Sequence, residues 1–203
     1  MKVIGLAGKA GSGKDFVYLT IDRALHAHQA VRRMAFADRV KVEIEEVTNQ
    51  GRNMIPLWTK PYSYEVRELL KWWGTDFRRA EDIDHWVTKS IPTFERLKQE
   101  GADVVCVTDV RFQNEVDFIH RMGGVVFEIV AKDYVRSERL NISEDEQRHL
   151  GTHATERIDL QHLDGVIDNN SFPRFPAHLN EYLGLPEGFQ PERVADVQDL
   201  FDG

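Results

Sequence analysis

A glycine-rich segment near the start of the chain constrains the fold more than any other feature. Residues 8–16 read GKAGSGKDF, between the apolar run Lys2 to Ala7 and a segment, Asp15 to His28, whose apolar residues recur with helical spacing. Strand, loop and helix in this order form a phosphate-binding loop, because glycines let backbone N–H groups surround an anion and the helix adds its positive end. We therefore expect a nucleotide site here.

One position of this loop departs from the usual pattern. The loop lysine, Lys14, is expected to reach the β and γ phosphates of the nucleotide, and a Ser or Thr hydroxyl normally follows it and binds Mg²⁺. Here Asp15 follows instead, and its carboxylate could bind Mg²⁺ directly or through a water. The alternative is an acidic residue that only complements the helix dipole. The residues that we expect to bind ATP here are Gly8, Gly11, Ser12, Gly13, Lys14, Asp15 and Phe16.

Strand-like and helix-like segments alternate along the rest of the chain. We expect strands at 2–7, 31–36, 102–108, 125–131 and 165–168, and helices at 15–28, 39–47, 64–73, 84–99, 114–122 and 175–183, with Pro92 kinking or splitting the fourth helix. Residues 132–153 are polar throughout and predict a mobile polar lid. This order predicts an α/β fold, a P-loop NTPase with three α/β/α layers and a mostly parallel sheet of about five strands.

Composition limits the classes of function. The 203 residues, 41% of them hydrophobic, predict a single domain over residues 1–203. The net charge of -8 argues against a general nucleic-acid partner, which would need a basic face. The sequence has no apolar run long enough for a membrane span, and its single cysteine, Cys106, suits a reducing compartment. We therefore expect a cytoplasmic protein with neither nucleic acid nor membrane as partner.

Acidic residues follow two of the predicted strands. Asp38 is expected at the start of a helix, where it is either an N-cap or a carboxylate that orients or deprotonates an attacking group. Asp109 and Arg111 lie in TDVRFQNE (108–115) at the end of a buried strand, where Asp109 could meet Mg²⁺ or a hydroxyl and Arg111 a phosphate. A structural salt bridge between the two is the alternative.

Two further groups of basic residues are candidates. Arg67, Arg78 and Arg79 flank WWGTD (72–76), which could form a wall that stacks a base and holds a phosphate, although one of Trp72 and Trp73 should be core. In the predicted lid, Arg136 and Arg139 could close on a transferring phosphoryl group or could be a solvated charge run. His149 and His153 have metal-pair spacing, but no third ligand is evident, so zinc is not expected.

Taken together, these segments resemble the deoxynucleoside monophosphate kinases of bacteriophages. The resemblance rests on GKAGSGKD (8–15), FADRVK (36–41), RELLKWWGTD (67–76), TDVRFQNE (108–115) and HATE (153–156). In that family Asp commonly follows the loop lysine, which implies a working site. The family usually has Ser or Thr where Phe16 stands and often Pro where Arg39 stands, so this chain departs from it in details of metal and acceptor binding.

The resemblance implies phosphoryl transfer from ATP, with Mg²⁺, to a deoxynucleoside monophosphate, giving ADP and a deoxynucleoside diphosphate for DNA synthesis in the host cytoplasm. The acceptor would bind in a helical region at about 38–100. It implies that Lys14, Asp38, Asp109 and Arg111 are catalytic and that Arg136 and Arg139 complete the ATP site. The implied acceptor-binding residues are Asp38, Lys41, Arg67, Trp72, Arg78, Arg111, Asn114 and Glu115.

Two alternatives stay open at this point. One is a related small-molecule kinase that acts on dephospho-coenzyme A or phosphomevalonate, which would share the phosphate loop and the acid after the second strand. The other is a regulatory module that binds a nucleotide without transferring a phosphoryl group, for which the missing hydroxyls at Asp15 and Phe16 argue. The base that is accepted and the choice between a monomer and a homodimer are not determined by the sequence.

Overall fold

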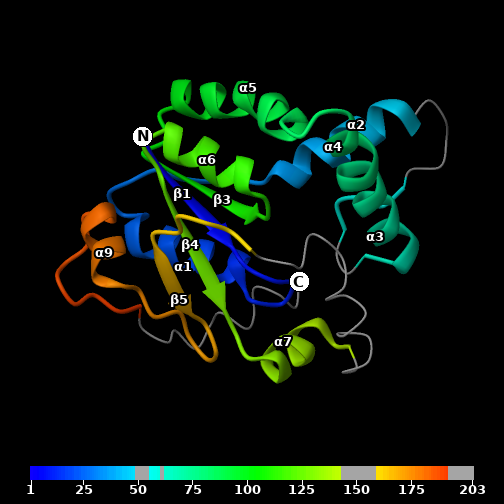
Figure 1. Cartoon of the computed structure of the whole chain (residues 1–203). Helices are drawn as coiled ribbons and strands as arrows, with labels where there is room; N and C mark the ends of the chain where they lie inside the picture. The colour runs from blue at the N-terminus through cyan, green and yellow to red at the C-terminus, as the bar shows by residue number, and fades with distance from the viewer. Residues whose placement is uncertain (49–54, 60–61, 143–158, 192–203) are drawn as a thin grey trace.

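The chain folds around one parallel β-sheet. The computed structural model describes residues 1–48, 55–59, 62–142 and 159–191. The five strands occur in the spatial order β2-β3-β1-β4-β5, and every neighbouring pair is parallel (Figure 1). They are β1 (Lys2–Ala7), β2 (Val31–Met34), β3 (Val104–Val110), β4 (Val125–Val130) and β5 (Gly165–Asp168). The predicted α/β/α fold of a P-loop NTPase is confirmed.

The burial of the central strands explains their composition. In β1 every residue after Lys2 is buried, and in β3 every residue except Asp109. A strand that is covered on both faces has no face in contact with water, so its sequence is a continuous run of apolar residues. The edge strand β2 has the sequence VRRM, and its two arginines are exposed.

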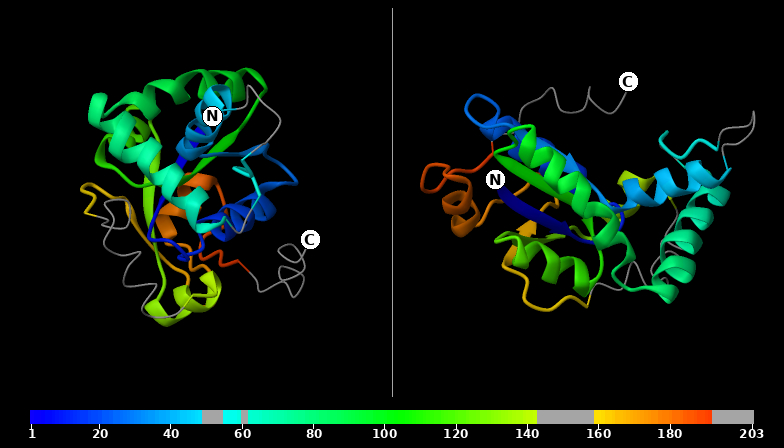
Figure 2. Two further views of the ribbon diagram at one scale, coloured as in Figure 1. Left: turned by 90° about the vertical axis from the view of Figure 1, so that its right-hand side faces the viewer. Right: turned by 90° about the horizontal axis from the view of Figure 1, so that it is seen from above.

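Helices cover the two faces of the sheet as separate layers (Figure 2). The helices α2 (Phe36–Thr48), α5 (His85–Gln99) and α6 (Gln113–Arg121) bury apolar side chains in one core cluster with one set of strand residues. The other set packs against α1 (Lys14–Leu25) and α9 (Ala177–Leu183) in a second cluster. Alternating strand residues thus serve two cores.

A helical arm extends beyond the sheet at one side (Figures 1 and 2). It contains the outer part of α2, α3 (Tyr64–Lys71), a π-helical segment (Trp72–Phe77) and the short α4 (Arg78–Glu81). The hydroxyl of Ser63 accepts a hydrogen bond from the Val66 N–H at 3.4 Å and so caps α3. The helix predicted at 64–73 is α-helical only as far as Lys71. It continues as the π-helical segment, whose turns are wider.

The structure adds detail to two sequence-based expectations. Helix α5 is continuous through Pro92, because buried residues on both sides of the proline, Trp86 and Phe94 among them, hold the helix in the core. The first part of the segment predicted as a polar lid forms helix α7 (Asp133–Leu140), in which Val135 and Arg136 are buried. Residues 143–153 of that segment lie outside the described residues.

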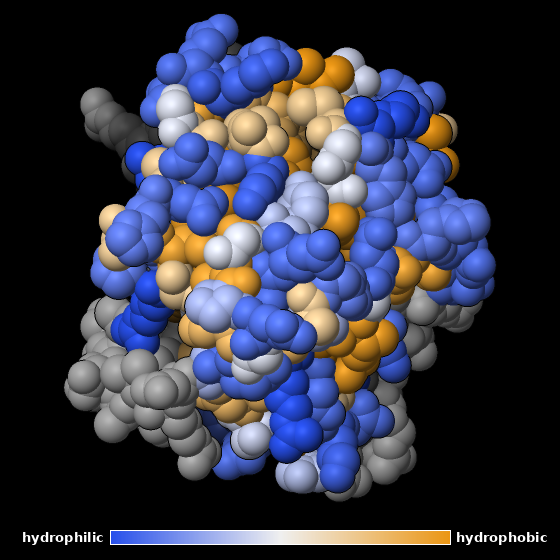
Figure 3. Space-filling model, turned by 90° about the vertical axis from the view of Figure 1, so that its left-hand side faces the viewer, coloured by the Kyte–Doolittle hydropathy of each residue, from blue (hydrophilic) through white to orange (hydrophobic). Residues whose placement is uncertain are grey.

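The surface is predominantly hydrophilic on the face opposite the helical arm. Figure 3 shows hydrophilic residues over most of this face, with apolar residues scattered among them. None of the helices that the structure describes combines the length and apolar character needed to span a membrane.

Candidate active site

The loop between β1 and α1 has the backbone conformation of a phosphate-binding loop. Gly8 and Gly13 have φ angles of 146° and 88°, which residues with a Cβ atom rarely adopt. A Cβ atom at Gly8 would lie 2.6 Å from the Ile129 carbonyl oxygen, and one at Gly13 would collide with the Asn169 side chain. Close packing against β4 and the segment after β5 therefore requires glycine at both positions.

Lys14 folds back over this loop. Its ammonium group donates hydrogen bonds to the carbonyl oxygens of Gly8 at 2.6 Å and Lys9 at 3.1 Å. This keeps the charge beside the loop, where a polyphosphate would meet it. Ser12 is buried, and its hydroxyl has no hydrogen-bond partner among the described residues. Phe16 packs edge-on against Phe172, with ring centroids 5.5 Å apart.

The two arginines of α7 bind the loop itself. Arg136 donates to the carbonyl oxygen of Ala10, and Arg139 lies against the carbonyl oxygens of Gly11 and Ser12. Burial lowers the pKa of Arg139 from its ordinary value. In this structure both side chains therefore contact the carbonyl side of the loop.

Asn169, which sequence reasoning missed, also contacts the loop. It is fully buried directly after β5, and its amide donates to the Ser12 carbonyl oxygen at 2.9 Å. A signal was present, because carboxyl ends of parallel strands meet at one edge of a sheet and Asn169 follows the last predicted strand.

A pocket of about 330 Å³ adjoins the amino-terminal part of α1. Three predicted site residues, Asp15, Asp38 and Lys41, meet in it, joined by Arg33, which sequence reasoning missed. The residues that line it are Asp15, Tyr18, Leu19, Arg33, Asp38, Lys41, Trp58 and Tyr62.

Ion pairs link the charged residues of this pocket. The guanidinium of Arg33 lies 3.5 Å from a carboxylate oxygen of Asp15 and 3.1 Å from one of Asp38. The ammonium nitrogen of Lys41 lies 3.1 Å from the other carboxylate oxygen of Asp38. Burial tends to lower the pKa of Arg33, but Asp38 and Asp15 outweigh it and raise the pKa. Two carboxylates and two cations thus balance in a partly exposed site, where an incoming anion can replace a carboxylate as partner of the cations.

The ammonium group of Lys41 lies against two aromatic rings. Its side chain is 10% exposed, and its ammonium lies 4.5 Å from the ring centroid of Trp58 and 5.9 Å from that of Tyr62. Such contacts stabilise the cation by a few tenths to about 2 kcal/mol. Arg67, predicted to bind the acceptor, donates to the Tyr62 carbonyl oxygen at 3.2 Å and so supports this wall of the pocket.

Asp109 has a structural partner that sequence reasoning did not foresee. Its carboxylate accepts hydrogen bonds from the N–H groups of Phe36 at 2.9 Å and Ala37 at 2.7 Å, so a residue of β3 caps α2. Burial raises the pKa of Asp109, and the two N–H groups oppose this shift. The geometry favours a capping role over contact with a substrate.

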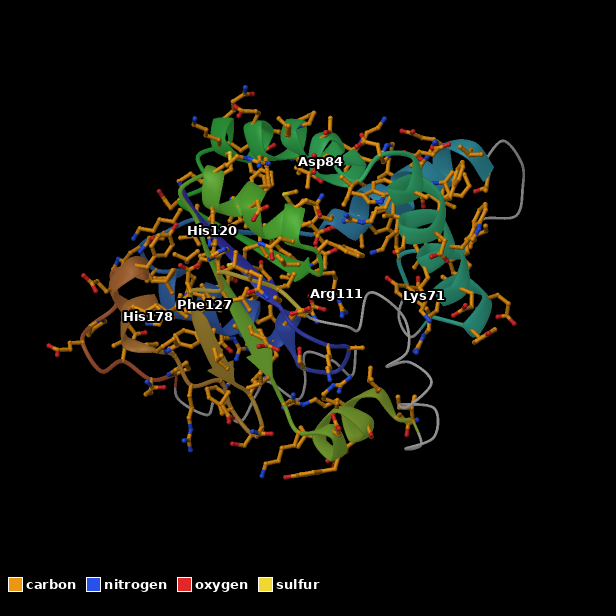
Figure 4. All side chains as sticks on the ribbon, in the orientation of Figure 1. Lys71, Asp84, Arg111, His120, Phe127 and His178 are labelled. Atoms are coloured by element: carbon orange, nitrogen blue, oxygen red, sulfur yellow. The ribbon has the colours of Figure 1, made fainter. Side chains whose placement is uncertain are left out.

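Arg111 lies at the end of β3, at the edge of the sheet that faces α3 (Figure 4). Lys71, on α3, lies across from it in the same view. The backbone N–H of Arg111 donates to Glu115 at 2.7 Å, which fixes the start of α6. Arg111 as a whole residue is half-buried. Ligands of parallel sheets bind at the carboxyl ends of the strands, and the phosphate-binding role of Arg111 stays a prediction.

Asn114 and Glu115 form part of a polar cluster beneath this edge. Both accept hydrogen bonds from Arg79, whose guanidinium also stacks 3.8 Å from the ring centroid of Phe112. Burial raises the pKa of Glu115 to about 7, and the Arg79 charge opposes this shift. These contacts favour structural roles for both residues.

The remaining predicted residues lie on the helical arm. Trp72 is 51% exposed and stacks on Phe77, with ring centroids 5.4 Å apart. Arg78 pairs with Glu43 of α2 and with Glu81. Trp73 is the partly buried member of the tryptophan pair and donates to Glu43 at 3.0 Å. Glu43 therefore joins the π-helical segment to α2.

The residues at the loop fit Mg²⁺. Asp15 offers a carboxylate that is 43% exposed, one residue after Lys14. Magnesium in such sites is held by one or two carboxylates, by waters and by the substrate phosphates, so no protein cage is required. Within the described ranges no three His, Cys, Asp or Glu residues gather into a metal site. His149, His153 and the HATE segment lie outside those ranges.

Comparison with known proteins decides the family. A protein of Acanthamoeba polyphaga mimivirus that bears the name "Putative deoxynucleotide monophosphate kinase" is 31% identical over 173 residues, covering 74% of this chain and 84% of the relative. The chain belongs to this kinase family. As a member of the family it is a P-loop kinase, with ATP as the phosphoryl donor. No protein-family model matches the sequence.

Solved structures with a similar arrangement have low sequence identity. TT1252 from Thermus thermophilus is 17% identical, with 83% of this chain and 88% of that chain covered and a TM-score of 0.48. A shikimate kinase from Aquifex aeolicus is 16% identical, with 82% and 85% covered and a TM-score of 0.40. Scores of this size carry no information about the substrate.

Proposed function

We propose that the protein transfers the terminal phosphoryl group of ATP to a deoxynucleoside monophosphate, as the bacteriophage kinases that its sequence resembles do. The observation that carries the proposal is the pocket beside the phosphate loop, where Arg33 and Lys41 supply charge for a phosphate and Trp58 and Tyr62 supply apolar surface for a nucleoside. The mimivirus relative, whose name specifies a deoxynucleotide monophosphate as substrate, supports the same acceptor class.

The donor would bind at the glycine-rich loop. Its backbone N–H groups and the positive end of α1 hold the phosphates, and the Lys14 ammonium exchanges its carbonyl partners for phosphate oxygens. Asp15 would hold Mg²⁺, alone or through water, and the bound ion would neutralise charge on the phosphates during transfer. Arg136 and Arg139 were expected to touch the donor, and we propose instead that they act through the loop.

The acceptor phosphate would lie between Lys41, Arg33 and Arg111. In the transfer an oxygen of the acceptor phosphate forms a bond to the terminal phosphorus of ATP, and the bond from that phosphorus to the oxygen bridging it to ADP breaks. The attacking oxygen is already ionised, so Asp38 is not needed as a strong base. We propose that Asp38 orients the cations Arg33 and Lys41 while the site is free of acceptor.

A product assay tests the proposal. The protein is incubated with ATP, Mg²⁺ and each of the four common deoxynucleoside monophosphates, and in parallel with dephospho-coenzyme A or phosphomevalonate, and the products are separated by chromatography. We expect ADP and a deoxynucleoside diphosphate from at least one acceptor. Product only with dephospho-coenzyme A or phosphomevalonate would replace the proposed acceptor, and nucleotide binding without any product would support a non-transferring module.

A further inference from the structure

Side chains from α7 hold the carbonyl side of the phosphate loop. The guanidinium Nε of Arg136 donates to the Ala10 carbonyl oxygen at 2.8 Å. One terminal nitrogen of Arg139 lies 3.4 Å from the carbonyl oxygen of Gly11 and 3.3 Å from that of Ser12. Three consecutive carbonyl groups of the loop are therefore engaged from the same helix.

A second segment, after β5, completes this clamp. Asn169 donates from its side-chain amide to the Ser12 carbonyl oxygen at 2.9 Å, and its backbone carbonyl accepts from Arg139 at 2.8 Å. Because Asn169 is fully buried, its side chain cannot move without disturbing its neighbours. Arg139 thus ties the loop to a fixed point of the sheet edge.

Peptide geometry turns this clamp into a constraint on the loop's N–H groups. In a trans peptide the C=O group and the N–H of the next residue point in opposite directions. With the carbonyl groups of Ala10 and Ser12 turned toward the clamp, the N–H groups of Gly11 and Gly13 point away from it. A loop with its donors already oriented binds an anion without first spending free energy on ordering them.

We propose that Arg139 and Asn169 are positioning residues that orient the loop N–H groups for the polyphosphate of the donor. They act through the loop carbonyls and make no contact with the transferred group. The inference concerns only the donor loop, so it does not depend on which acceptor the kinase uses.

The test measures binding of the donor phosphates separately from the nucleoside. Arg139→Met removes the guanidinium but keeps an unbranched side chain of similar length, so we expect the fold to persist, which thermal unfolding checks. Dissociation constants for ADP and for inorganic tripolyphosphate are measured by titration calorimetry. We expect both to rise about tenfold, the cost of ordering the backbone of about one loop residue on binding, while the constant for a deoxynucleoside monophosphate stays unchanged.

A second variant and a control separate positioning from simple charge loss. Asn169→Leu keeps similar volume without a donor, and we expect the same selective loss for both polyphosphate probes. Lys132→Ala removes an exposed cation at the start of α7. The hydrogen bonds described for Lys132 are made by its backbone, the N–H to Asn170 and the carbonyl oxygen from the Arg136 N–H, so the affinities of this variant should match the wild type. Hydrogen exchange of residues 8–16 without ligand should be faster in both clamp variants and unchanged in the control.

Four results would overturn the inference. Unchanged polyphosphate affinity in Arg139→Met would show that the clamp does not organise the loop. A loss for ADP without a loss for tripolyphosphate would mean that Arg139 contacts the nucleoside, and an equal loss in Lys132→Ala would mean a long-range charge effect. A wild-type protein that binds neither probe would overturn the donor site itself and this inference with it, whatever the acceptor assay shows.

Discussion

Among single residues, the sequence predicts those whose role depends on the neighbouring chain. It does not predict those whose role depends on contacts with distant segments. Gly8, Gly13 and Lys14 follow from the backbone and charge that a phosphate loop needs, and the structure places them accordingly. Arg33 could not be picked out, because in the VRRM strand it looks like any exposed residue of an edge strand. Its place in the pocket depends on ion pairs with Asp15 and Asp38, which only the folded chain brings beside it.

The loop lysine gives the first prediction. Lys14→Ala removes an ammonium group that donates to carbonyl oxygens of the phosphate loop, where a polyphosphate would meet it. We expect the fold to persist while phosphoryl transfer falls by at least about a hundredfold. Rates of ADP formation and thermal unfolding curves measure the two effects. The matched control is Lys9→Ala, an exposed lysine in the same loop, which should keep near wild-type activity. Equal activity of the two variants would remove Lys14 from the mechanism.

Arg111 gives the second prediction. Its removal should weaken binding of the monophosphate acceptor about tenfold or more, with little change for ADP, because a charge-assisted contact to one phosphate is lost. Calorimetric titration of Arg111→Ala with each ligand measures this split. Arg96→Ala, which removes a surface arginine on α5 with a side chain 61% exposed, should change neither value. Equal losses for acceptor and ADP would contradict the assignment of Arg111 to the acceptor.

At the scale of helices and strands, capping and packing decide details that periodicity cannot. The apolar pattern predicts α2 and α5, but it does not show that Asp109 of β3 caps α2 from another part of the chain. Nor does it show that α5 passes through Pro92 without splitting, since this depends on burial of Trp86 and Phe94 on either side. Tertiary contacts override local preference in both places.

The buried ion pair between α4 and α6 gives the third prediction. In the Arg79–Glu115 pair the side chains are 7% and 3% exposed, so Glu115→Ala leaves a buried guanidinium without its charge partner. We expect the free energy of unfolding to fall by about 3 kcal/mol or more in urea titrations. Glu100→Ala breaks the exposed pair with Arg96 and should cost less than about 1 kcal/mol. Similar costs for both variants would show that the cluster does not stabilise the fold.

Glu43 gives a prediction about pH. Burial pushes its pKa upward, but hydrogen bonds from His85, Trp73 and Arg78 outweigh this and lower the pKa below 4.5. A carboxyl group with a lowered folded-state pKa stabilises the fold above its unfolded pKa and loses that contribution as pH falls through the folded value. The deficit of Glu43→Gln in free energy of unfolding should therefore keep its value from pH 7 down to about 5 and shrink as pH falls further, through the lowered pKa of the folded state.

Urea titrations at several pH values measure this deficit. Glu46→Gln changes an exposed residue on the same helix and should show a small difference that does not change with pH. A Glu43→Gln deficit that stays constant or grows toward acidic pH would contradict the assignment of Glu43 as a stabilising hub of the helical arm.

At the scale of the whole molecule, the order of strands and helices predicts where the site lies. The order β2-β3-β1-β4-β5 brings the carboxyl ends of β1 and β3 side by side, so the loop after β1 and the TDVR segment of β3 share one edge. The sequence placed Arg136 and Arg139 at the ATP site, but it did not show that they bind the carbonyl groups of the loop, because a polar helix shows no apolar face that would indicate what it packs against.

We propose that the protein binds ATP at the donor loop and a deoxynucleoside monophosphate in the adjoining pocket, and transfers a phosphoryl group between them. A single-turnover reaction with ATP labelled on its terminal phosphate, excess protein and each deoxynucleoside monophosphate tests it most directly. We predict that the label appears in a deoxynucleoside diphosphate, with little in inorganic phosphate, for at least one acceptor. Label that stays in ATP or appears only as inorganic phosphate with all four acceptors would contradict the account.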